Sequence, residues 1–481
     1  MLLTEIGYDG VFSVTTDYRF AMWGKMGRSL KVAVFLPWLP LPYAASFWVW
    51  FWIARDPDTR VVEFIVFYVF QHLLWFYLFK KREHFSVVVL LFSAATCFVV
   101  SRSVAPIYEN DFYRYFWDGH QTLSGNSPYA FSPSEMRVPH LEWLRSQVAF
   151  PEYRTVYPPV AQLLFAVFTR FSFGSLSLFL WGLILAGTLV CGLGFYRKAR
   201  ESHGRSIALA VTALALQHPL LVKEWYQSCH FDVWLAAIVI WSVGVQEIWK
   251  QAGLLILGIG IKIAPLPALL VMFPFSRNQM AKAVLGAGVS LAMILIWSFH
   301  DLSDFFQAVT VFGREWEMNS GPFRWVRHFA LSMGNSEVVS QNVARGFTLI
   351  SYLSVLGVIR CYRVKLSGPE KIFWALFFLV FLSPIANPWY FTWFLLLVFF
   401  FPDSKRSVVL FLFSFLPLSY AFYLPQEKFL SLENWWDLEY LGMVLCLAYL
   451  VVSLNRRQAG HFLTNQKERT IWGYLRRSSQ I

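Results

Sequence analysis

The chain has 481 residues, of which 57% are hydrophobic, 19% are aromatic and only 15% are charged. A water-soluble domain normally carries about 25% charged residues, so this composition excludes a string of soluble domains. It also excludes a nucleic-acid binder, a disordered chain and a disulfide-rich secreted scaffold, since each needs a polar surface or a higher cysteine density. The composition predicts an all-α polytopic membrane protein. Its net charge of +12 is expected mainly in cytoplasmic loops.

Apolar runs of about 17 to 25 residues, long enough for a helix to cross the hydrocarbon core, recur along the chain. They predict about 12 transmembrane helices, at 32–54, 61–79, 84–105, 175–196, 206–222, 231–249, 281–298, 341–360, 371–386, 389–402, 406–424 and 437–455. Two shorter apolar segments, 252–261 and 264–275, lie on either side of Lys262. Ten helical residues rise only about 15 Å, so this pair predicts a re-entrant hairpin of half-helices. We expect a single integral-membrane domain over 1–480.

Basic residues indicate the orientation, because Lys and Arg are enriched in short cytoplasmic loops. A cytoplasmic N-terminus places the basic clusters at 80–82 and 197–205 inside, together with a basic tail over 456–481. This orientation requires the apolar segment 158–173 to be interfacial instead of spanning. It predicts a long extracytoplasmic loop over 106–174, partly helical, which includes this interfacial segment.

The densest set of polar and aromatic residues follows the third predicted span, where residues 108–120 read YENDFYRYFWDGH. On a helix Asp111, Arg114 and Asp118 share one face, and Trp117 lies beside Asp118 in the chain. Aromatic rings that tune the pKa of a carboxylate, with a nearby Arg to orient it, are the ingredients of a general base. The alternative is an interfacial aromatic belt with a few solvated charges.

Two further motifs lie on the predicted outer side. Tyr129 ends a turn signal at 125–129, and Tyr157 precedes the two prolines that begin the interfacial segment. His230 and Asp232 lie two residues apart at the outer start of a span. No further His or carboxylate completes a metal site at this spacing, so hydrogen bonding to a polar substrate, or a helix N-cap by Asp232, is favoured over metal binding.

Lys262 is an ionisable residue within an apolar sequence, where its charge costs at least about 2.5 kcal/mol. Such a residue predicts a functional site, and its natural partner is an anion, to which half-helix ends add backbone donors. The alternative is that the side chain snorkels to the membrane interface.

Two later segments carry aromatic residues on the predicted outer side. The segment 313–325 contains Arg314, Trp316 and Asn319, which suit binding of a phosphate or stacking on a sugar, or alternatively contact with lipid headgroups. The proline-rich segment 383–393 contains Trp389 and Tyr390, which are either belt residues or platforms for a sugar ring or an isoprenoid chain. The five cysteines are scattered and predict neither a disulfide framework nor a metal site.

In this order, these segments resemble the GT-C superfamily of membrane glycosyltransferases, and most closely glycosyltransferase family 87 and its polyprenyl-phosphate-mannose-dependent relatives. The resemblance covers most of the chain from about Ser101 to Trp393. It rests on 109–111, 117–119, 126–129, 157–159, 230–232, 262–265, 316–319 and 388–390. Each motif is weak alone, and their joint order makes the resemblance specific.

The resemblance implies an inverting transfer of a hexose, with mannose favoured, from a polyprenyl-phosphate-sugar donor to a glycolipid or envelope-glycan acceptor. The general base of the family falls on Asp111, with Asp118 as the second candidate. Lys262 is expected to stabilise the leaving lipid phosphate. The remaining candidates, expected to bind substrate, are Arg114, Trp117, Tyr129, Tyr157, His230, Asp232, Arg314, Trp316, Asn319, Trp389 and Tyr390. No metal and no cofactor is implied, and the location is expected to be a bacterial inner membrane.

Two features of the chain depart from the family pattern. Asn387 stands where relatives often have a His, so a proton-transfer role at this position is in doubt. Three predicted spans precede the acidic loop where many relatives have one, so the first 80 residues have no family-derived role. The alternatives are a transporter or flippase of a lipid-linked saccharide, which Lys262 and broken helices also suit, and a ligase that transfers a preassembled glycan.

Overall fold

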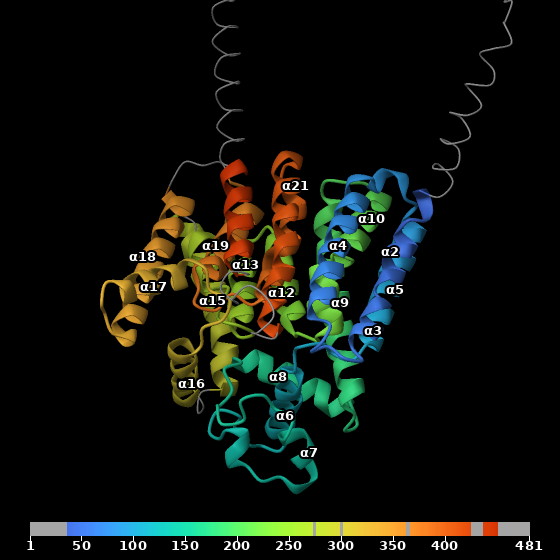
Figure 1. Ribbon diagram of the computed structural model, residues 1–481. Coiled ribbons are helices and arrows are strands. Elements are labelled where there is room, and N and C mark those ends of the chain that lie inside the picture. Colours follow the sequence, from blue (N-terminus) through green and yellow to red (C-terminus); the bar gives the residue numbers. More distant parts are fainter. Residues whose placement is uncertain (1–35, 273–275, 299–301, 362–365, 425–435, 451–481) are drawn as a thin grey trace, which may run out of the picture.

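The computed structural model describes residues 36–272, 276–298, 302–361, 366–424 and 436–450. It is 77% helical, and the described ranges contain no strand. The predicted all-α class is therefore confirmed. Figure 1 shows a bundle of roughly parallel helices with a smaller lobe at one end.

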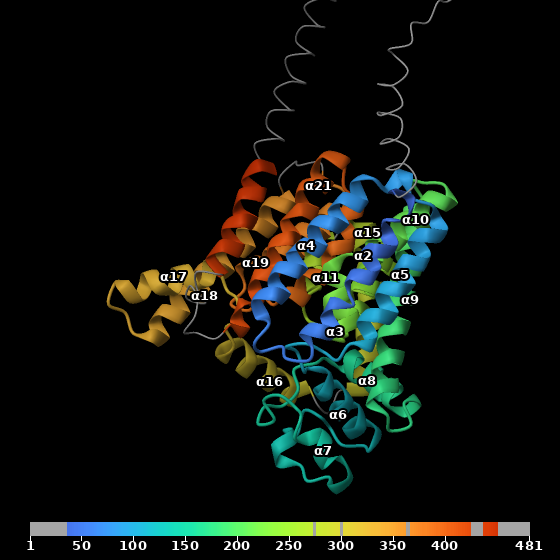
Figure 2. The same cartoon turned by 45° about the vertical axis from the view of Figure 1, so that its right-hand side comes forward.

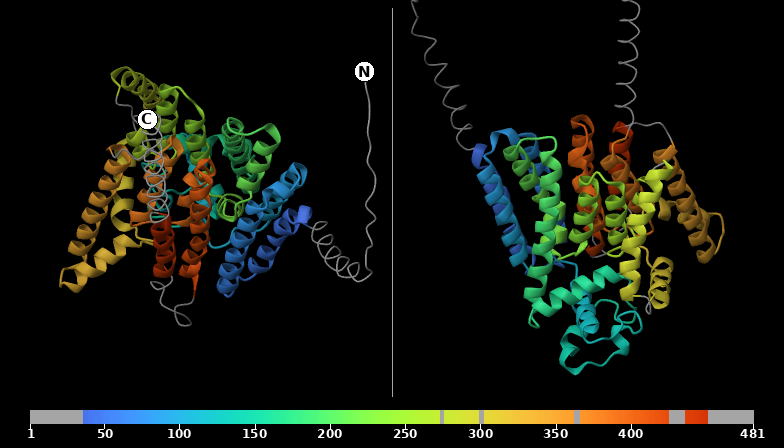
Figure 3. Two further views of the ribbon diagram at one scale, coloured as in Figure 1. Left: turned by 90° about the horizontal axis from the view of Figure 1, so that it is seen from above. Right: turned by 180° about the vertical axis from the view of Figure 1, so that it is seen from behind.

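The N-terminal helices precede this lobe in the chain. They are α2 (Pro40–Ser46), α3 (Val49–Ile53), α4 (Val61–Lys80) and α5 (Val87–Ser103). The lobe itself contains α6 (Phe112–Leu123), α7 (Glu142–Arg145) and α8 (Pro159–Phe171) and is called the outer lobe below, after the extracytoplasmic side predicted for residues 106–174. In Figures 1 and 3, α8 lies across the end of the bundle, as a segment that does not span is expected to lie.

The middle of the chain returns to the bundle. It forms α9 (Leu176–Arg200), α10 (Arg205–Leu216), α11 (Pro219–Leu221), the π-helical turn η5 (Val222–Gln227), α12 (Asp232–Gly244), α13 (Ile248–Ile259), α14 (Leu266–Met272) and α15 (Arg277–Ser298). The C-terminal part contains α16 (Leu302–Glu315), α17 (Pro322–Ser332), α18 (Glu337–Cys361), α19 (Gly368–Leu382), η7 (Pro388–Phe391), α20 (Thr392–Leu395), η8 (Leu396–Phe400), α21 (Asp403–Leu412), η9 (Phe413–Tyr423) and a helix over 436–450. Figure 2 shows α17 and α18 projecting on one side of the molecule, away from α2 and α5.

Five described helices are long and apolar enough to cross a membrane: Val61–Lys80, Leu176–Arg200, Arg277–Leu295, Glu337–Cys361 and Lys405–Tyr423. A sixth span results if Arg205–Leu216 and Pro219–Gln227, which are bent by 55° against each other, are counted together. All six coincide with predicted spans, and together they give the chain the character of a membrane protein. Several other predicted spans fall on shorter apolar helices, so the number of about 12 spans and the re-entrant hairpin stay predictions.

The predicted span 231–249 is wrong at its inner end. α12 ends at Gly244, and α13 begins at Ile248 after a short turn. The two helices are antiparallel, because a Cβ at Gly258 would lie 3.2 Å from a side-chain carbon of Ile238. They contain 13 and 12 residues and therefore rise by similar amounts, about 18 to 20 Å. Their far ends meet for this reason, which brings the start of α12 next to the residues that follow α13.

The bend between α10 and α11 is supported by the N-terminal helices. Pro219 interrupts the helical hydrogen bonding there, and unpaired backbone groups are costly inside a membrane protein. The Tyr43 hydroxyl donates to the carbonyl oxygen of Gln217 at 2.5 Å, and the Ser93 hydroxyl donates to the Gln217 side chain at 2.5 Å. The first 80 residues, to which the family resemblance gives no role, thus help to hold the broken helix.

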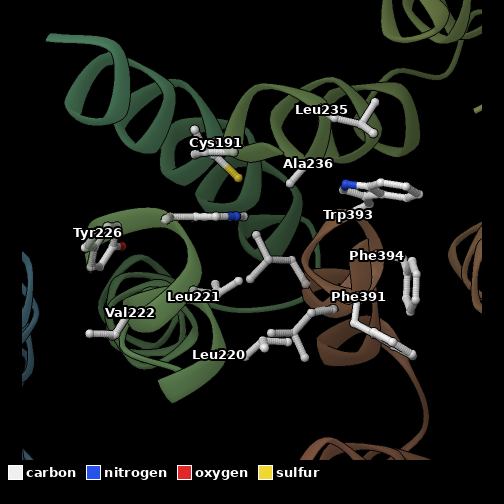
Figure 4. Packing of buried hydrophobic residues seen from close by; sticks show 14 of the residues in the cluster. Cys191, Leu220, Leu221, Val222, Tyr226, Leu235, Ala236, Phe391, Trp393 and Phe394 are labelled. Carbon is white, nitrogen blue, oxygen red and sulfur yellow. The ribbon is translucent and has the colours of Figure 1, made fainter. Parts of the chain in front are cut away.

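Apolar packing fixes this broken helix against the rest of the bundle. Leu220 and Leu221 are fully buried, and Figure 4 shows them between η5, α12 and the segment that carries Phe391 and Phe394. α12 approaches α9 closely because Gly187 lacks a side chain, since a Cβ there would lie 2.6 Å from Val233. The starts of α12 and α20 and the end of η5 are therefore held together around one small region.

Candidate active site

The closest ion pair in this region joins the start of α12 to the residues after α13. Asp232 is fully buried, and its Oδ1 accepts a hydrogen bond from Lys262 Nζ at 2.6 Å. Trp393 Nε1 donates to the same oxygen, whereas Asp232 Oδ2 has no hydrogen-bond partner among the described residues. The Lys262 side chain keeps 15% of its surface exposed.

Three aromatic rings surround the Lys262 ammonium. Its Nζ lies 4.9 Å from the ring centre of Tyr390, 5.2 Å from Trp393 and 5.3 Å from Phe231. Tyr390 and Trp393 are themselves stacked, with their ring centres 4.6 Å apart. Ring faces attract a cation, and together with Asp232 they hold the ammonium inward. This arrangement argues against the snorkelling alternative for Lys262, because a snorkelling head group lies in water.

Asp111 is the N-cap residue of α6 and lies close enough to this ion pair for the charges of both Lys262 and Asp232 to act on it. Its Oδ2 accepts a hydrogen bond from the Tyr157 hydroxyl at 3.5 Å. Burial raises the pKa of Asp111 above its usual value, while the nearby charges of Lys262 and Arg114 lower it. A partly buried carboxylate with a raised pKa, beside a reachable cation, is suited to accepting a proton from a hydroxyl group.

Asp118 lies two turns further along α6, away from the surface. It is 1% exposed, and its Oδ2 accepts a hydrogen bond from Gln162 Nε2 at 3.1 Å. The same nitrogen donates to the Thr155 hydroxyl at 3.1 Å, so this contact ties α6 to α8 and to the chain before it. Burial raises the pKa of Asp118 to about 6, against the lowering effects of Arg114 and of the hydrogen bonds that Asp118 makes with Thr155 and Gln162.

Arg114, Trp117 and Tyr129 lie within the outer lobe. The Arg114 guanidinium donates to the carbonyl oxygens of Tyr153 at 2.9 Å and of Phe150 at 2.8 Å, so it holds the loop before α8. Trp117 is 2% exposed and belongs to the core. The Tyr129 hydroxyl donates to the carbonyl oxygen of Tyr157 at 2.8 Å. These three side chains shape the lobe around Asp111 and do not face Lys262.

His230 lies behind the ion pair and is fully buried. Its ring stacks on Trp389, with the ring centres 4.2 Å apart and the planes at 14°. Its Nδ1 lies 3.5 Å from the Tyr115 hydroxyl, and its Nε2 lies 3.7 Å from Oε2 of Glu224. His230 is therefore held by buried protein groups on three sides.

The candidates of the third outer segment are divided between two places. Arg314 is exposed and pairs with Glu315 at 2.8 Å, outside the group around Lys262. Trp316 packs edge-on against Tyr153, with the ring centres 4.5 Å apart, and so covers the outer lobe. Asn319 is buried with φ at 50°, and its Nδ2 donates to the carbonyl oxygen of Ala386 at 3.1 Å, which fixes the turn before Trp389.

The structure thus brings together Asp111, Tyr157, Asp232, Lys262 and Tyr390, with His230 and Trp389 directly behind. Sequence reasoning did not select Tyr115, Glu224 and Trp393, which complete this region. Glu224 carried a signal, because it is a carboxylate in a buried stretch after Pro219, like Lys262 in its own apolar stretch. Tyr115 and Trp393 carried none, since aromatic residues are abundant throughout this chain.

Within the ranges that the structure describes, no group of three His, Cys, Asp or Glu side chains is arranged to hold a metal ion. His230 has only Glu224 as a close carboxylate neighbour, at 3.7 Å.

The apolar spans, the outer lobe and the charged site at its base define an integral-membrane protein with a site at one end of a helical bundle. Residues 155–388 match the family model for glycosyltransferase family 87. This match, which covers just under half of the chain, is consistent with a GT-C-type glycosyltransferase of family 87, as the sequence motifs predicted. The matched segment includes Asp232 and Lys262 but begins after Asp111. No curated protein and no solved structure matches the chain.

Proposed function

We propose that this glycosyltransferase transfers a hexose, with inversion at the anomeric carbon, from a polyprenyl-phosphate-sugar donor to a glycolipid or envelope-glycan acceptor. Among hexoses we propose mannose. The reaction takes place on the extracytoplasmic face of a bacterial inner membrane, with both termini in the cytoplasm. The proposed architecture is a GT-C fold with about 12 transmembrane helices, a re-entrant hairpin at Lys262 and the catalytic outer loop 106–174.

One observation carries this proposal: Asp111 faces the Lys262–Asp232 pair inside an aromatic wall. Transfer from a lipid phosphate to a hydroxyl requires a proton acceptor and a cation for the departing phosphate. The Asp111 carboxylate and the Lys262 ammonium are close enough for the ammonium to lower the pKa of Asp111. Lys262 is also partly exposed, so a phosphate can compete with Asp232 for it.

In the proposed reaction, Asp111 accepts the proton of the acceptor hydroxyl as its oxygen attacks the anomeric carbon. The new bond joins this oxygen to the anomeric carbon, and the bond from that carbon to the phosphate oxygen breaks. Its electron pair leaves with the polyprenyl phosphate, whose added negative charge is stabilised by Lys262. Attack opposite the leaving group inverts the anomeric configuration.

The other predicted residues take supporting roles in this proposal. Tyr390 and Trp389 offer ring faces on which a sugar or an isoprenoid unit packs. Asp118, buried against Gln162, positions α6 and is the less suitable base, since an acceptor cannot reach it without displacing this contact. Arg314 and Trp316 lie at the outer surface, where an acceptor approaches.

Transfer by purified protein in lipid vesicles tests the proposal, with radiolabelled polyprenyl-phosphate-mannose and a membrane lipid extract as substrates. The wild type is expected to form labelled product, and Asp111→Asn to lower the rate about 10²- to 10⁴-fold. Asp403→Asn is a matched control, because the Asp403 side chain is 83% exposed and pairs with Arg406 at 3.0 Å. Equal transfer by the wild type and Asp111→Asn contradicts the base assignment, and a loss confined to Asp118→Asn transfers the role to Asp118.

The same vesicles distinguish the alternative functions. A flippase moves the labelled lipid between leaflets without forming product, and a ligase requires a polyprenyl-diphosphate-linked glycan in place of the monophosphate donor. Replacing the mannose donor by the corresponding glucose donor tests the sugar. Loss of transfer to the lipid extract, with retained hydrolysis of the donor, indicates that the acceptor is a different glycan.

A further inference from the structure

A line of four buried or partly buried side chains leads from the interior of the bundle to Asp111. It consists of Glu224 on η5, His230 before α12, Tyr115 on α6 and Tyr157 before α8. The side chains of Glu224 and His230 are fully buried, and Tyr115 is 1% exposed. The transfer mechanism described above assigns no task to Glu224, His230 or Tyr115.

The polar atoms along this line are close neighbours. Glu224 Oε2 lies 3.7 Å from His230 Nε2, and His230 Nδ1 lies 3.5 Å from the Tyr115 hydroxyl. Tyr115 hydrogen-bonds Tyr157, whose hydroxyl lies 3.5 Å from Asp111 Oδ2. In the described part of the chain, neither Glu224 Oε2 nor His230 Nε2 has a hydrogen-bond partner, so the two atoms are the nearest polar groups available to each other. Catalytic contacts of this length often tighten when substrate binds.

The direction of these hydrogen bonds follows from Asp111. An ionised carboxylate only accepts, so Tyr157 must donate to it. The Tyr157 oxygen then accepts from Tyr115, and the Tyr115 oxygen accepts from a hydrogen on His230 Nδ1. Glu224 Oε2 lies 3.7 Å from His230 Nε2, beyond hydrogen-bonding distance, so it acts on the end of the line through its charge. Hydrogen bonds aligned in one direction polarise and strengthen one another in a buried environment.

We propose that Glu224, His230, Tyr115 and Tyr157 are positioning residues, which hold the Asp111 carboxylate through this directed line so that its second oxygen faces the acceptor hydroxyl. This inference rests on the proposed role of Asp111 as the base. Trp389 supports the line from the side by stacking on His230. Tyr420 supports it at the far end, where its hydroxyl donates to Glu224 Oε1 at 2.7 Å.

The pH dependence of transfer reports on this line, because Asp111 must be ionised to act. Groups that face Asp111 from the surrounding elements are Lys262, Asp232, Arg114, Glu109, Tyr157, Tyr115, Tyr390 and Tyr423. The hydrogen bond from Tyr157 lowers the pKa of Asp111. Removal of this donor therefore raises that pKa, and activity is lost at a higher pH when the solution is acidified.

The test is the pH profile of kcat/KM, measured for the wild type, Tyr157→Phe, Glu224→Gln and the double variant. Tyr157→Phe is expected to lower kcat/KM at neutral pH about tenfold or more and to move the acidic limb upward. Glu224→Gln is expected to lower kcat/KM at neutral pH by about three- to tenfold. Glu224→Asp is expected to retain part of the activity that Glu224→Gln loses. The double variant is expected to match Tyr157→Phe alone, since the line is already cut.

Tyr352→Phe is the matched control for loss of a buried hydroxyl. The Tyr352 hydroxyl on α18 donates to the carbonyl oxygen of Ala375 on α19 at 3.0 Å. Removal of this hydroxyl is expected to leave the acidic limb of the pH profile in place. The inference is overturned if Tyr157→Phe leaves the acidic limb in place, or if the effects of the two single variants multiply in the double variant. If Asp111→Asn loses transfer and either of these results is also found, this inference fails and the proposed base stands. If Asp111→Asn keeps full activity, the proposed base itself is wrong.

Discussion

The protein buries positive charge in two different ways on neighbouring elements. In the first region, called the open cluster, Lys262 pairs with Asp232 and keeps 15% of its side chain exposed. In the second, called the closed cluster, Lys223 is fully buried beside Glu224 and Tyr420. Lys223 Nζ donates to the carbonyl oxygen of Ile107 at 3.3 Å and lies 4.8 Å from the ring centre of Tyr420.

The difference between the clusters is access, because both lysines have aromatic neighbours and a carboxylate nearby. Every direction around Lys223 is filled by protein, so this lysine compensates buried carboxylates and ties η5 to the start of the outer lobe. Lys262 keeps 15% of its side chain exposed, and its charge acts on Asp111. A charged residue inside an apolar sequence therefore predicts either binding or framework, and only the fold distinguishes the two.

The largest expected effect comes from removing the cation of the open cluster. Lys262→Met is expected to lower kcat/KM for the lipid-phosphate donor about 10²- to 10³-fold, because the departing phosphate loses its charge partner. Transfer assays over a range of donor concentrations measure it. Lys262→Arg is the control that keeps a positive charge. The double variant Lys262→Met with Asp232→Asn tests whether an Asp232 without its ion-pair partner contributes to the loss of activity. Unchanged donor binding and transfer in Lys262→Met would contradict the open cluster as the phosphate site.

The matched change in the closed cluster is expected to act on stability. Lys223→Met leaves Glu224 without its compensating charge and is expected to lower the free energy of unfolding by about 3 kcal/mol. The thermal midpoint of the detergent-solubilised protein measures this loss. The fraction that remains folded is expected to bind the donor with nearly wild-type affinity. A normal midpoint combined with weak donor binding would instead show that the closed cluster contacts substrate, and the comparison would fail.

The sequence predicted the all-helical membrane fold, and it selected three of the charged residues that the structure brings together, Asp111, Asp232 and Lys262. These residues could be selected because an ionisable residue stands out against an apolar background. The meeting of Asp232 with Lys262 could not be predicted, since it depends on α12 and α13 having nearly equal lengths. The predicted span 231–249 runs past the turn after Gly244, because the residues on both sides of that turn are apolar.

Arg114 illustrates a second limit of sequence reasoning. Its spacing from Asp111 is correct for one helix face, yet its guanidinium donates to carbonyl oxygens of residues 149–153. Hydrogen bonds to the backbone leave no pattern in the sequence, since every residue has a carbonyl oxygen. Asp118 was proposed on the same spacing argument, and its contact with Gln162 on α8 was equally invisible.

The two aspartates of α6 repeat the contrast between open and closed sites, with a smaller expected effect. Burial raises the pKa of Asp118 to about 6, above its usual value of 3.8. The folded protein therefore holds this proton more tightly than the unfolded chain, so ionised Asp118 destabilises the fold above pH 6 and this penalty disappears as the pH falls towards 4. Asp118→Asn is expected to raise the free energy of unfolding at pH 8 by about 1 to 3 kcal/mol and to change it little near pH 4. Thermal midpoints of both proteins across this pH range measure the difference, and transfer activity is expected to persist in the variant. A stability gain that does not depend on pH would mean that packing against Gln162, and not the buried charge, distinguishes Asp118 from Asp111.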